Sequence, residues 1–146
     1  MNTRGIYEVV AGSGLCTEYD ETFPDWGTSV ENMWKYIDER DWLAGTFIWT
    51  GFDYGGEPLS DFWPTVNSNF GIIDYAGFPK DNFYYLKSWW TDSIVLHLSP
   101  HWNWPGQEGK MKRVVCNTNC DEVELKLDGK SLGRKTVPRT HRGNKI

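Results

Sequence analysis

The pattern of apolar residues changes near residue 93. This change divides the chain into two parts, and each part is too short to form a complete domain. Before residue 93, apolar residues recur at helical spacing or form one short run; after it, they alternate as in strands. The first half offers too few strands to close a barrel. The second offers three or four strands, whereas a sandwich domain usually needs about seven. Neither half can bury a full core, so we interpret the sequence as a piece of a larger protein.

The first half, residues 1–92, is predicted to have an α/β fold. A helix is expected from a capping box at Thr28 to about Arg40, burying Val30, Met33, Trp34 and Ile37. The apolar run 45–49 is typical of a buried parallel strand, and the Gly- and Pro-rich stretch 50–69 predicts a long functional loop. A second helix is expected to have Pro79 near its first turn and to end at about Trp90, burying some of Phe83, Tyr84, Leu86, Trp90 and the stem of Lys87. This order is typical of a (β/α) barrel, whose sites lie at the C-terminal ends of its strands.

The second half, residues 93–146, is predicted to be the beginning of an all-β domain. Asp128-Gly129 lies between two alternating segments and is a strong hairpin signal. The turn 101–106 is rich in aromatic residues, and 138–146 has no apolar pattern. The expected strands are Ile94–Leu98, Met111–Cys116, Val123–Leu127 and Ser131–Val137.

Composition narrows the classes of function. Aromatic residues make up 16% of the chain, including nine Trp, and flat rings stack on sugars, protein partners or bases. The net charge of −5 argues against nucleic-acid binding, which needs a basic surface. No stretch approaches the ~20 apolar residues of a membrane span. The three cysteines have no histidine pair at zinc spacing, so we expect no metal and no cofactor.

Several motifs resemble glycoside hydrolase family 2, in particular its bacterial β-galactosidase-like branch. The similarity covers roughly residues 1–137 in the family's own order, and its motifs are Gly45-Thr-Phe-Ile-Trp-Thr-Gly-Phe-Asp-Tyr-Gly-Gly-Glu-Pro58, Asn69-Phe-Gly-Ile-Ile-Asp-Tyr-Ala-Gly-Phe-Pro-Lys-Asp81, Leu96-His-Leu-Ser-Pro-His-Trp-Asn-Trp-Pro-Gly106 and the segment 117–133. The resemblance implies that 1–92 is the C-terminal part of a (β/α)8 TIM barrel. It implies that 93–146 begins an immunoglobulin-like β-sandwich.

The resemblance implies that the catalytic glutamates lie outside this sequence. Asn2-Thr-Arg-Gly-Ile-Tyr7 resembles the stretch just after the family's nucleophile, which would then precede Met1. Retaining hydrolysis needs two carboxyl groups about 5–5.5 Å apart. The acids Asp20, Glu21, Asp53, Glu57, Asp61 and Asp74 do not match the family's catalytic positions. We therefore expect no catalytic residue here and no activity of the chain alone. Localisation is left open, although intact relatives are expected to be periplasmic or secreted.

Sugar-binding residues are expected to remain. The resemblance assigns Trp49 as the floor on which a sugar stacks, and places a cis peptide at Trp49–Thr50. Asn69, Asp53 and Glu57 are expected to line the same site, with loop-fixing hydrogen bonds as an equally weighted alternative. The aromatic residues His101, Trp102 and Trp104 resemble sugar-binding residues by type, but their place at a domain junction favours packing as their role.

The expected substrate is a neutral β-glycoside. Family β-glucuronidases carry Asn-x-Lys before the glycine that matches Gly71, and here the triplet is Ser68-Asn69-Phe70. A β-galactoside is the first choice. The alternatives are a carbohydrate-binding module without catalysis and a protein-interaction domain. Open barrel edges at Phe47, Ile48 and the apolar stripe of helix 28–40 predict self-association.

Overall fold

The computed structural model describes residues 23, 26–57 and 67–137, which fall into two compact units. One unit extends to Leu86 and the other begins at Lys87. Each is described by itself below. The division falls inside a helix, a few residues before the boundary predicted at residue 92. The assignment of the two parts to a barrel and a sandwich stays a prediction.

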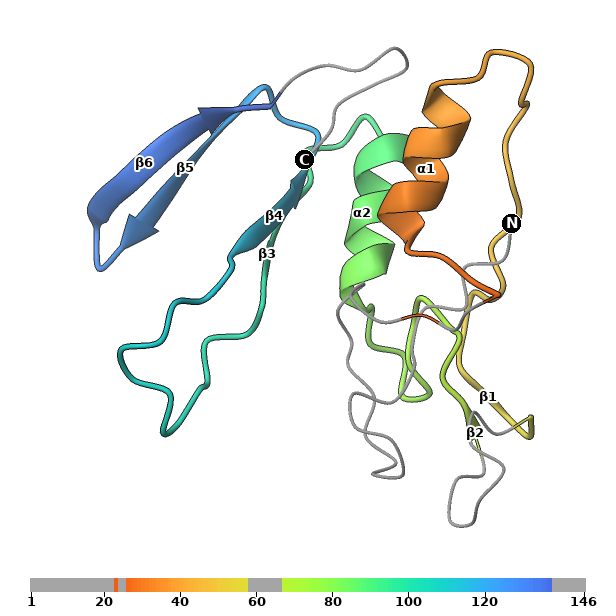
Figure 1. The fold of residues 1–146 in the computed structure, drawn as a ribbon, viewed down its shortest axis with the longest axis horizontal. Helices are drawn as coiled ribbons and strands as arrows, with labels where there is room; N and C mark the ends of the chain where they lie inside the picture. Colours follow the sequence, from red (N-terminus) through yellow and green to blue (C-terminus); the bar gives the residue numbers. More distant parts are fainter. Residues whose placement is uncertain (1–22, 24–25, 58–66, 138–146) are drawn as a thin grey trace. The chain divides into compact units, whose positions relative to one another are not determined.

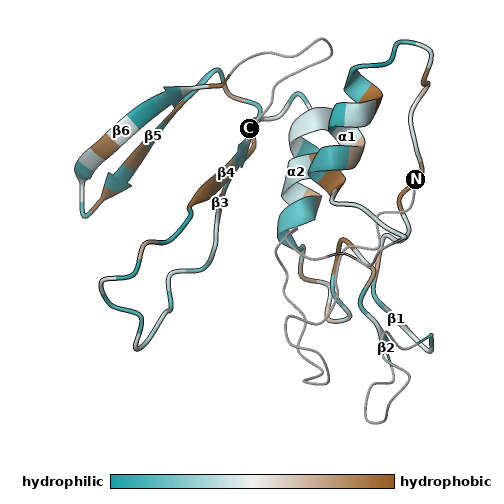
Figure 2. Cartoon of the chain, viewed as in Figure 1, coloured by the Kyte–Doolittle hydropathy of each residue, from teal (hydrophilic) through white to brown (hydrophobic). Residues whose placement is uncertain are grey.

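The first unit contains the helix α1, Val30–Asp38 (Figure 1). Ser29 caps its N-terminus, and the Ser29 side chain accepts a hydrogen bond from the Asn32 backbone N at 3.1 Å. The prediction of Thr28 as the cap was therefore wrong by one residue, because two capping residues are adjacent. Figure 2 shows both hydrophilic and hydrophobic residues along α1. Val30, Met33 and Ile37 are buried, as the helical spacing predicted, so the expectation that open barrel edges leave this stripe exposed was wrong.

The run 45–49 is not the predicted buried strand. In the described part of the chain it pairs with no neighbour, and Phe47 is 96% exposed. A strand needs adjacent strands to satisfy its backbone groups, and none lies beside this run within residues 26–57 and 67–86. Regular pairing begins just after it, where Thr50 N donates to Phe70 O at 3.1 Å and Ile73 N donates to Gly51 O at 3.1 Å.

The stretch after residue 50 doubles back on itself. Phe52 and Ile73 form an isolated parallel bridge. The short strands β1, Tyr54–Gly55, and β2, Asn67–Ser68, then pair antiparallel. In Figure 1 this pair lies at the end of the unit opposite to the C-terminus of α1. Residues 58–66 of the predicted functional loop lie outside the described residues.

The helix α2, Asp81–Trp90, spans the division between the units. Pro79 lies two residues before the helix, near its first turn as predicted. Lys80 N donates a hydrogen bond to Ile72 O at 2.9 Å. Tyr85 and Leu86 are buried, as are the small polar residues Asn82 and Ser88. Of the candidates for the buried face, Leu86 is therefore buried, whereas Trp90 is 56% exposed and Lys87 is also exposed.

The second unit is built from two antiparallel strand pairs. β3, Leu96–Ser99, pairs with β4, Val115–Thr118. β5, Glu122–Leu127, pairs with β6, Lys130–Thr136. Asp128 and Gly129 have φ angles of 49° and 79° between the last two strands, which confirms the predicted hairpin. The Ser99–Pro100 peptide bond is cis.

Asn119 and Thr118 fasten the start of this unit. The Asn119 side-chain amide donates to Thr91 O and Ser93 O, and its oxygen accepts from Val95 N at 2.9 Å. The buried Thr118 hydroxyl donates to Val95 O at 2.7 Å. Among the described residues, neither helix is long and apolar enough to cross a membrane.

Candidate functional site

Trp49 presents an indole ring at the surface of the first unit. Half of the residue is exposed, and the Trp49–Thr50 peptide bond is cis, which confirms the expectation drawn from the resemblance. The indole Nε1 donates to the Tyr54 hydroxyl at 3.2 Å. The two rings meet edge to face, with centroids 6.1 Å apart and planes at 84°. Tyr54 therefore fixes the orientation of an exposed aromatic surface.

Glu57 extends this contact into a chain of three residues. The Tyr54 hydroxyl donates to Glu57 Oε2. The backbone turns sharply here, since Gly56 has φ 82° and Glu57 itself has φ 45°, which is uncommon for a residue with a side chain. The carboxylate thus stands two hydrogen bonds from the indole edge. Sequence reasoning missed Tyr54; its place three residues before Glu57, across a Gly55-Gly56 turn, was the available signal.

Asp53 occupies a different environment from Glu57. Its side chain is only 6% exposed. Its Oδ1 accepts from Lys80 Nζ at 2.7 Å and from the Gly71 backbone N at 2.7 Å. The Lys80 ammonium also donates to Asn69 O at 3.1 Å. These hydrogen bonds fix the loop, which is the alternative role expected for Asp53. Contact between Asp53 and a sugar stays a prediction.

Gly71 permits this packing because it has no side chain. A Cβ atom placed on it would lie 2.2 Å from Asp53 N and 2.3 Å from the carbonyl carbon of Phe52. Atoms that are not bonded to each other do not approach so closely. The clashing atoms belong to the backbone, so they cannot move aside as a flexible side chain could. The segments 50–53 and 69–73 can therefore approach only with glycine at this position.

Lys80 is a cation that the sequence argument did not consider. The triplet Ser68-Asn69-Phe70 contains no lysine, whereas Lys80, eleven residues beyond Asn69, donates to the Asn69 backbone carbonyl. Its side chain is 3% exposed and its charge is matched by Asp53. A buried ammonium bonded in this way is committed to the protein rather than offered to a ligand.

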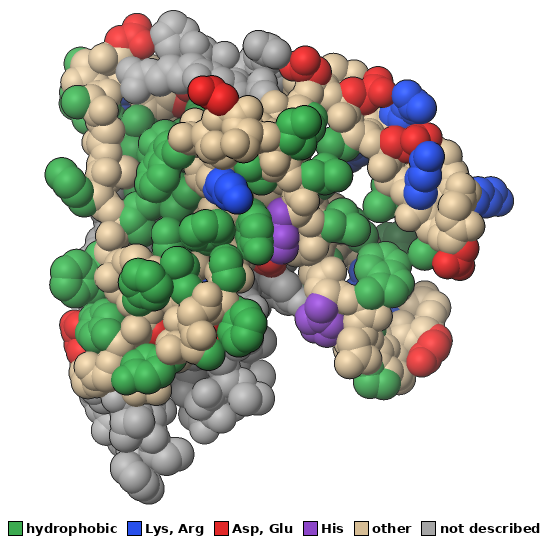
Figure 3. All heavy atoms as spheres, turned by 180° about the vertical axis from the view of Figure 1, so that it is seen from behind, with side chains coloured by type: hydrophobic (Ala, Val, Ile, Leu, Met, Phe, Trp, Pro, Cys, Tyr) green, Lys and Arg blue, Asp and Glu red, His purple; other side chains and the backbone are tan. Residues whose placement is uncertain are grey.

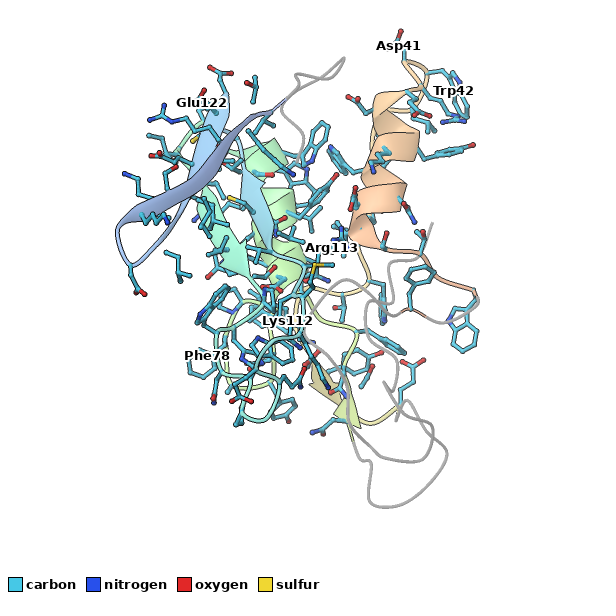
Figure 4. The ribbon with its side chains drawn as sticks, turned by 60° about the vertical axis from the view of Figure 1, so that its left-hand side comes forward. Asp41, Trp42, Phe78, Lys112, Arg113 and Glu122 are labelled. Carbon is cyan, nitrogen blue, oxygen red and sulfur yellow. The ribbon has the colours of Figure 1, made fainter. Side chains whose placement is uncertain are left out.

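The aromatic turn of the second unit forms its own cluster. The rings of His101 and Trp104 stack at 4.6 Å with planes at 12°, and Trp104 Nε1 donates to His101 O at 2.7 Å. Lys112 places its ammonium 3.7 Å above the Trp104 ring (Figure 4). These mutual contacts give His101 and Trp104 a packing role within the turn, while Trp102 is 63% exposed.

The described residues hold no group of three or more His, Cys, Asp or Glu side chains placed to bind a metal ion. Cys116 and Cys120 are free thiols. Burial raises the pKa of the Cys116 thiol, and the neighbouring Cys120 raises it further. Figure 3 shows many hydrophobic side chains at the visible surface. The exposed large hydrophobic residues of the first unit include Phe47, Phe52, Tyr75 and Phe78.

Comparisons with known proteins give consistent relatives. A family model described as a domain of unknown function, DUF4982, matches residues 109–145. The chain is 48% identical over 130 residues to β-galactosidase BoGH2A of Bacteroides ovatus, covering 86% of the chain and 15% of that protein. It is 38% identical over 115 residues to a putative β-glucuronidase of Formosa agariphila, covering 73% of the chain and 10% of that protein.

Solved structures extend the likeness to the fold. A β-glycosidase from Bacteroides vulgatus superposes with a TM-score of 0.70 at 41% identity, covering 83% of this chain and 16% of that one. A glycosyl hydrolase family 2 member from Bacteroides cellulosilyticus gives 0.60 at 31% identity, covering 70% and 18%. The chain thus spans a small part of each relative's length, and the shared part has the fold found in these enzymes.

Proposed function

Because the chain belongs to glycoside hydrolase family 2, we propose that it supplies the sugar-binding rim of a retaining glycosidase. The proposed substrate is a β-linked neutral sugar, with a β-galactoside as the first choice. In the whole protein, the unit ending at Leu86 would be the C-terminal part of the barrel, and the unit from Lys87 would begin the sandwich.

One observation carries this proposal: Trp49 is half exposed while its edge is fixed by Tyr54. A large, rigid ring held with part of its surface in solvent is suited to stack on the apolar face of a pyranose. Glu57 and Asn69 are proposed to give polar contacts at the same rim. Asp53 is proposed to hold the segments below the rim in place, because its carboxylate accepts hydrogen bonds from Lys80 and Gly71.

A neutral sugar is favoured by the charges around Asn69. A uronic acid carries a carboxylate that a site must match with a cation. The cation found here, Lys80, is already neutralised by Asp53 and almost fully buried. The relatives include both a β-galactosidase at 48% identity and β-glucuronidases at lower identity, and the preference for a neutral sugar follows from this chain's own residues.

Catalysis is proposed to depend on carboxylates that this sequence does not supply. Retaining hydrolysis requires a nucleophile and an acid/base residue on either side of the glycosidic bond. The acids near Trp49 hold other partners: Asp53 is bonded to Lys80, and Glu57 to Tyr54. The chain alone should therefore bind a sugar without hydrolysing it. Turnover of an aryl β-galactoside by the purified chain, lost on substitution of Glu57, would contradict this.

Binding can be tested by NMR of the nine indole N–H groups. Methyl β-D-galactopyranoside is titrated into the ¹⁵N-labelled chain, and the Trp49 signal is assigned by its loss in Trp49→Phe. We expect that signal to move saturably. Trp42, which is 75% exposed beyond the C-terminus of α1, is the matched control, assigned by Trp42→Phe. An unmoved Trp49 signal, or an equal shift at Trp42, would refute the proposed site.

Self-association is a further proposal for the isolated chain. Phe47 is 96% exposed, and Phe52 is 60% exposed. Both lie in the segment around Trp49, so this apolar surface is accessible in the unit as described. A concentration-dependent increase in sedimentation coefficient would support it. A single monomer species across the accessible concentration range would exclude it.

A further inference from the structure

In the described part of the rim, a carboxylate lies close to the exposed ring of Trp49. Glu57 is exposed and its carboxylate is held by the Tyr54 hydroxyl, which itself accepts from the Trp49 indole. The nearby positive charge of Lys80 is cancelled by Asp53 at 2.7 Å, and both side chains are buried. Among the described residues, the charged side chain joined to Trp49 through Tyr54 is therefore an acid. An anion stacked on Trp49 would meet that acid rather than a base.

We infer that Glu57 is a specificity-determining residue that disfavours anionic sugars on the Trp49 surface. The inference rests on the proposed function, because it takes Trp49 as the stacking surface. Repulsion between like charges lowers affinity for one member of a substrate pair and leaves the neutral member unaffected. Glu57 thus selects by rejection, in addition to any hydrogen bond that it makes to a neutral sugar.

The geometry makes this repulsion directional. A glutamate on a free loop would swing away from an incoming anion. Here the turn at Gly56 and Glu57, with φ 82° and 45°, brings the carboxylate back to Tyr54. Tyr54 in turn is anchored to the indole by the 3.2 Å hydrogen bond and by the edge-to-face ring contact. The charge is therefore kept beside the surface on which the sugar would lie.

The test compares two ligands that differ only at C6. Methyl β-D-galactopyranoside is neutral, and methyl β-D-galactopyranosiduronate carries a carboxylate at the same carbon. Both are titrated into the full chain, with the Trp49 indole signal as the readout. The wild type is expected to bind the neutral ligand more tightly. Glu57→Gln should narrow the ratio of the two dissociation constants by about two- to fivefold, the range of exposed charge pairs.

Ionic strength gives a readout that a merely structural role would not move. Raising salt from about 0.01 M to about 0.15 M shortens the screening length from about 30 Å to about 8 Å. The preference of the wild type for the neutral ligand should shrink over this range. In Glu57→Gln the ratio should depend less on salt. A wild-type ratio that salt does not change would overturn the inference.

Two further variants separate charge at the rim from charge elsewhere. Tyr54→Phe keeps the Glu57 charge and removes the hydroxyl that holds it, so it should lose part of the discrimination. Asp41→Asn removes one negative charge beyond the C-terminus of α1, at the other end of the same unit (Figure 4), and should leave the ratio unchanged. Equal narrowing by Asp41→Asn, or an unchanged ratio in both Glu57→Gln and Tyr54→Phe, would overturn the inference.

The outcomes also distinguish this inference from the proposed function. If neither ligand moves the Trp49 signal, the proposed site fails and the role of Glu57 fails with it. If both ligands bind the wild type with equal affinity, the stacking surface stands and the inference fails. A neutral preference that Glu57→Gln narrows and salt weakens supports both.

Discussion

Replacing Lys80 by Met should destabilise the first unit strongly. The Asp53 and Lys80 side chains are 6% and 3% exposed and their charged atoms are 2.7 Å apart. Methionine keeps much of the apolar stem but removes two hydrogen bonds, to Asp53 Oδ1 and to Asn69 O. It also leaves the Asp53 carboxylate buried with the Gly71 N–H as its described remaining donor.

The size of the effect follows from these contacts. A hydrogen bond to a charged group contributes about 1.5–3 kcal/mol, and two are lost. Breaking a buried ion pair by removing one partner typically costs about 3–5 kcal/mol. Both routes give a loss of at least about 3 kcal/mol in the free energy of unfolding, which is a large share of a small domain's stability.

The loss can be measured by urea unfolding, with hydrogen exchange at the Gly71 and Ile73 amides as the probe. These amides lie in the first unit, so they report on the part of the chain that contains Lys80. The double variant Asp53→Asn with Lys80→Met should recover part of it, because the uncompensated charge is gone. Lys35→Met is the matched control: Lys35 pairs with Glu31 on α1, with the two side chains 42% and 39% exposed. That pair should contribute only about 0.3–0.5 kcal/mol. Equal losses at Lys80 and Lys35, or strict additivity in the double variant, would refute the reasoning.

Two other predictions follow from close packing and from burial. Gly71→Ala should reduce the free energy of unfolding by more than about 3 kcal/mol, because its Cβ would lie 2.2 Å from Asp53 N; Gly51→Ala, whose Cβ meets nothing within 4 Å, should change it by less than about 0.5 kcal/mol in the same urea titration. The Cys116 thiol should be alkylated by iodoacetamide more slowly in the folded chain than in urea across the alkaline range, because burial raises its pKa from 9.0 and the thiolate is the reactive form. The protonated thiol is favoured in the folded state, so its contribution to stability is present below pH 9.0 and is lost as the pH rises through the folded pKa. Equal alkylation rates for Cys116 in the two states would contradict this.

Local signals in the sequence predicted the regular elements well. Asp128-Gly129 specified its hairpin because both residues tolerate the positive φ that the turn needs. Val30, Met33 and Ile37 specified the buried face of α1 because their spacing matches the helical period. The N-cap was misplaced by one residue, since Thr28 and Ser29 satisfy the same rule and only the hydrogen bond to Asn32 N distinguishes them.

The site was harder to predict, because its contacts join residues that are distant in the sequence. Lys80 meets Asp53 across 27 positions, and nothing near either residue indicates the other. Trp49 was found through the resemblance rather than through its own spacing. The run 45–49 was expected to form a strand of the buried type, and that was wrong, since an apolar run does not tell which segment would pair with it. The exposure of Phe47, expected at an open barrel edge, is confirmed. The exposed Phe47 shows that such a run can lack its neighbours.

The contacts around Asp53 also bear on the order in which this part of the protein becomes ordered during synthesis. Asp53 emerges from the ribosome before both of its partners: Gly71 follows it by 18 residues and Lys80 by 27. Until Lys80 has emerged, the Asp53 carboxylate lacks the cation that compensates its burial. The entropy lost on closing a loop grows only slowly with loop length, so pairing across 27 residues costs little more than pairing across 18. The segment that carries Trp49 is therefore expected to acquire its final shape only when the residues that lead into α2 have left the ribosome.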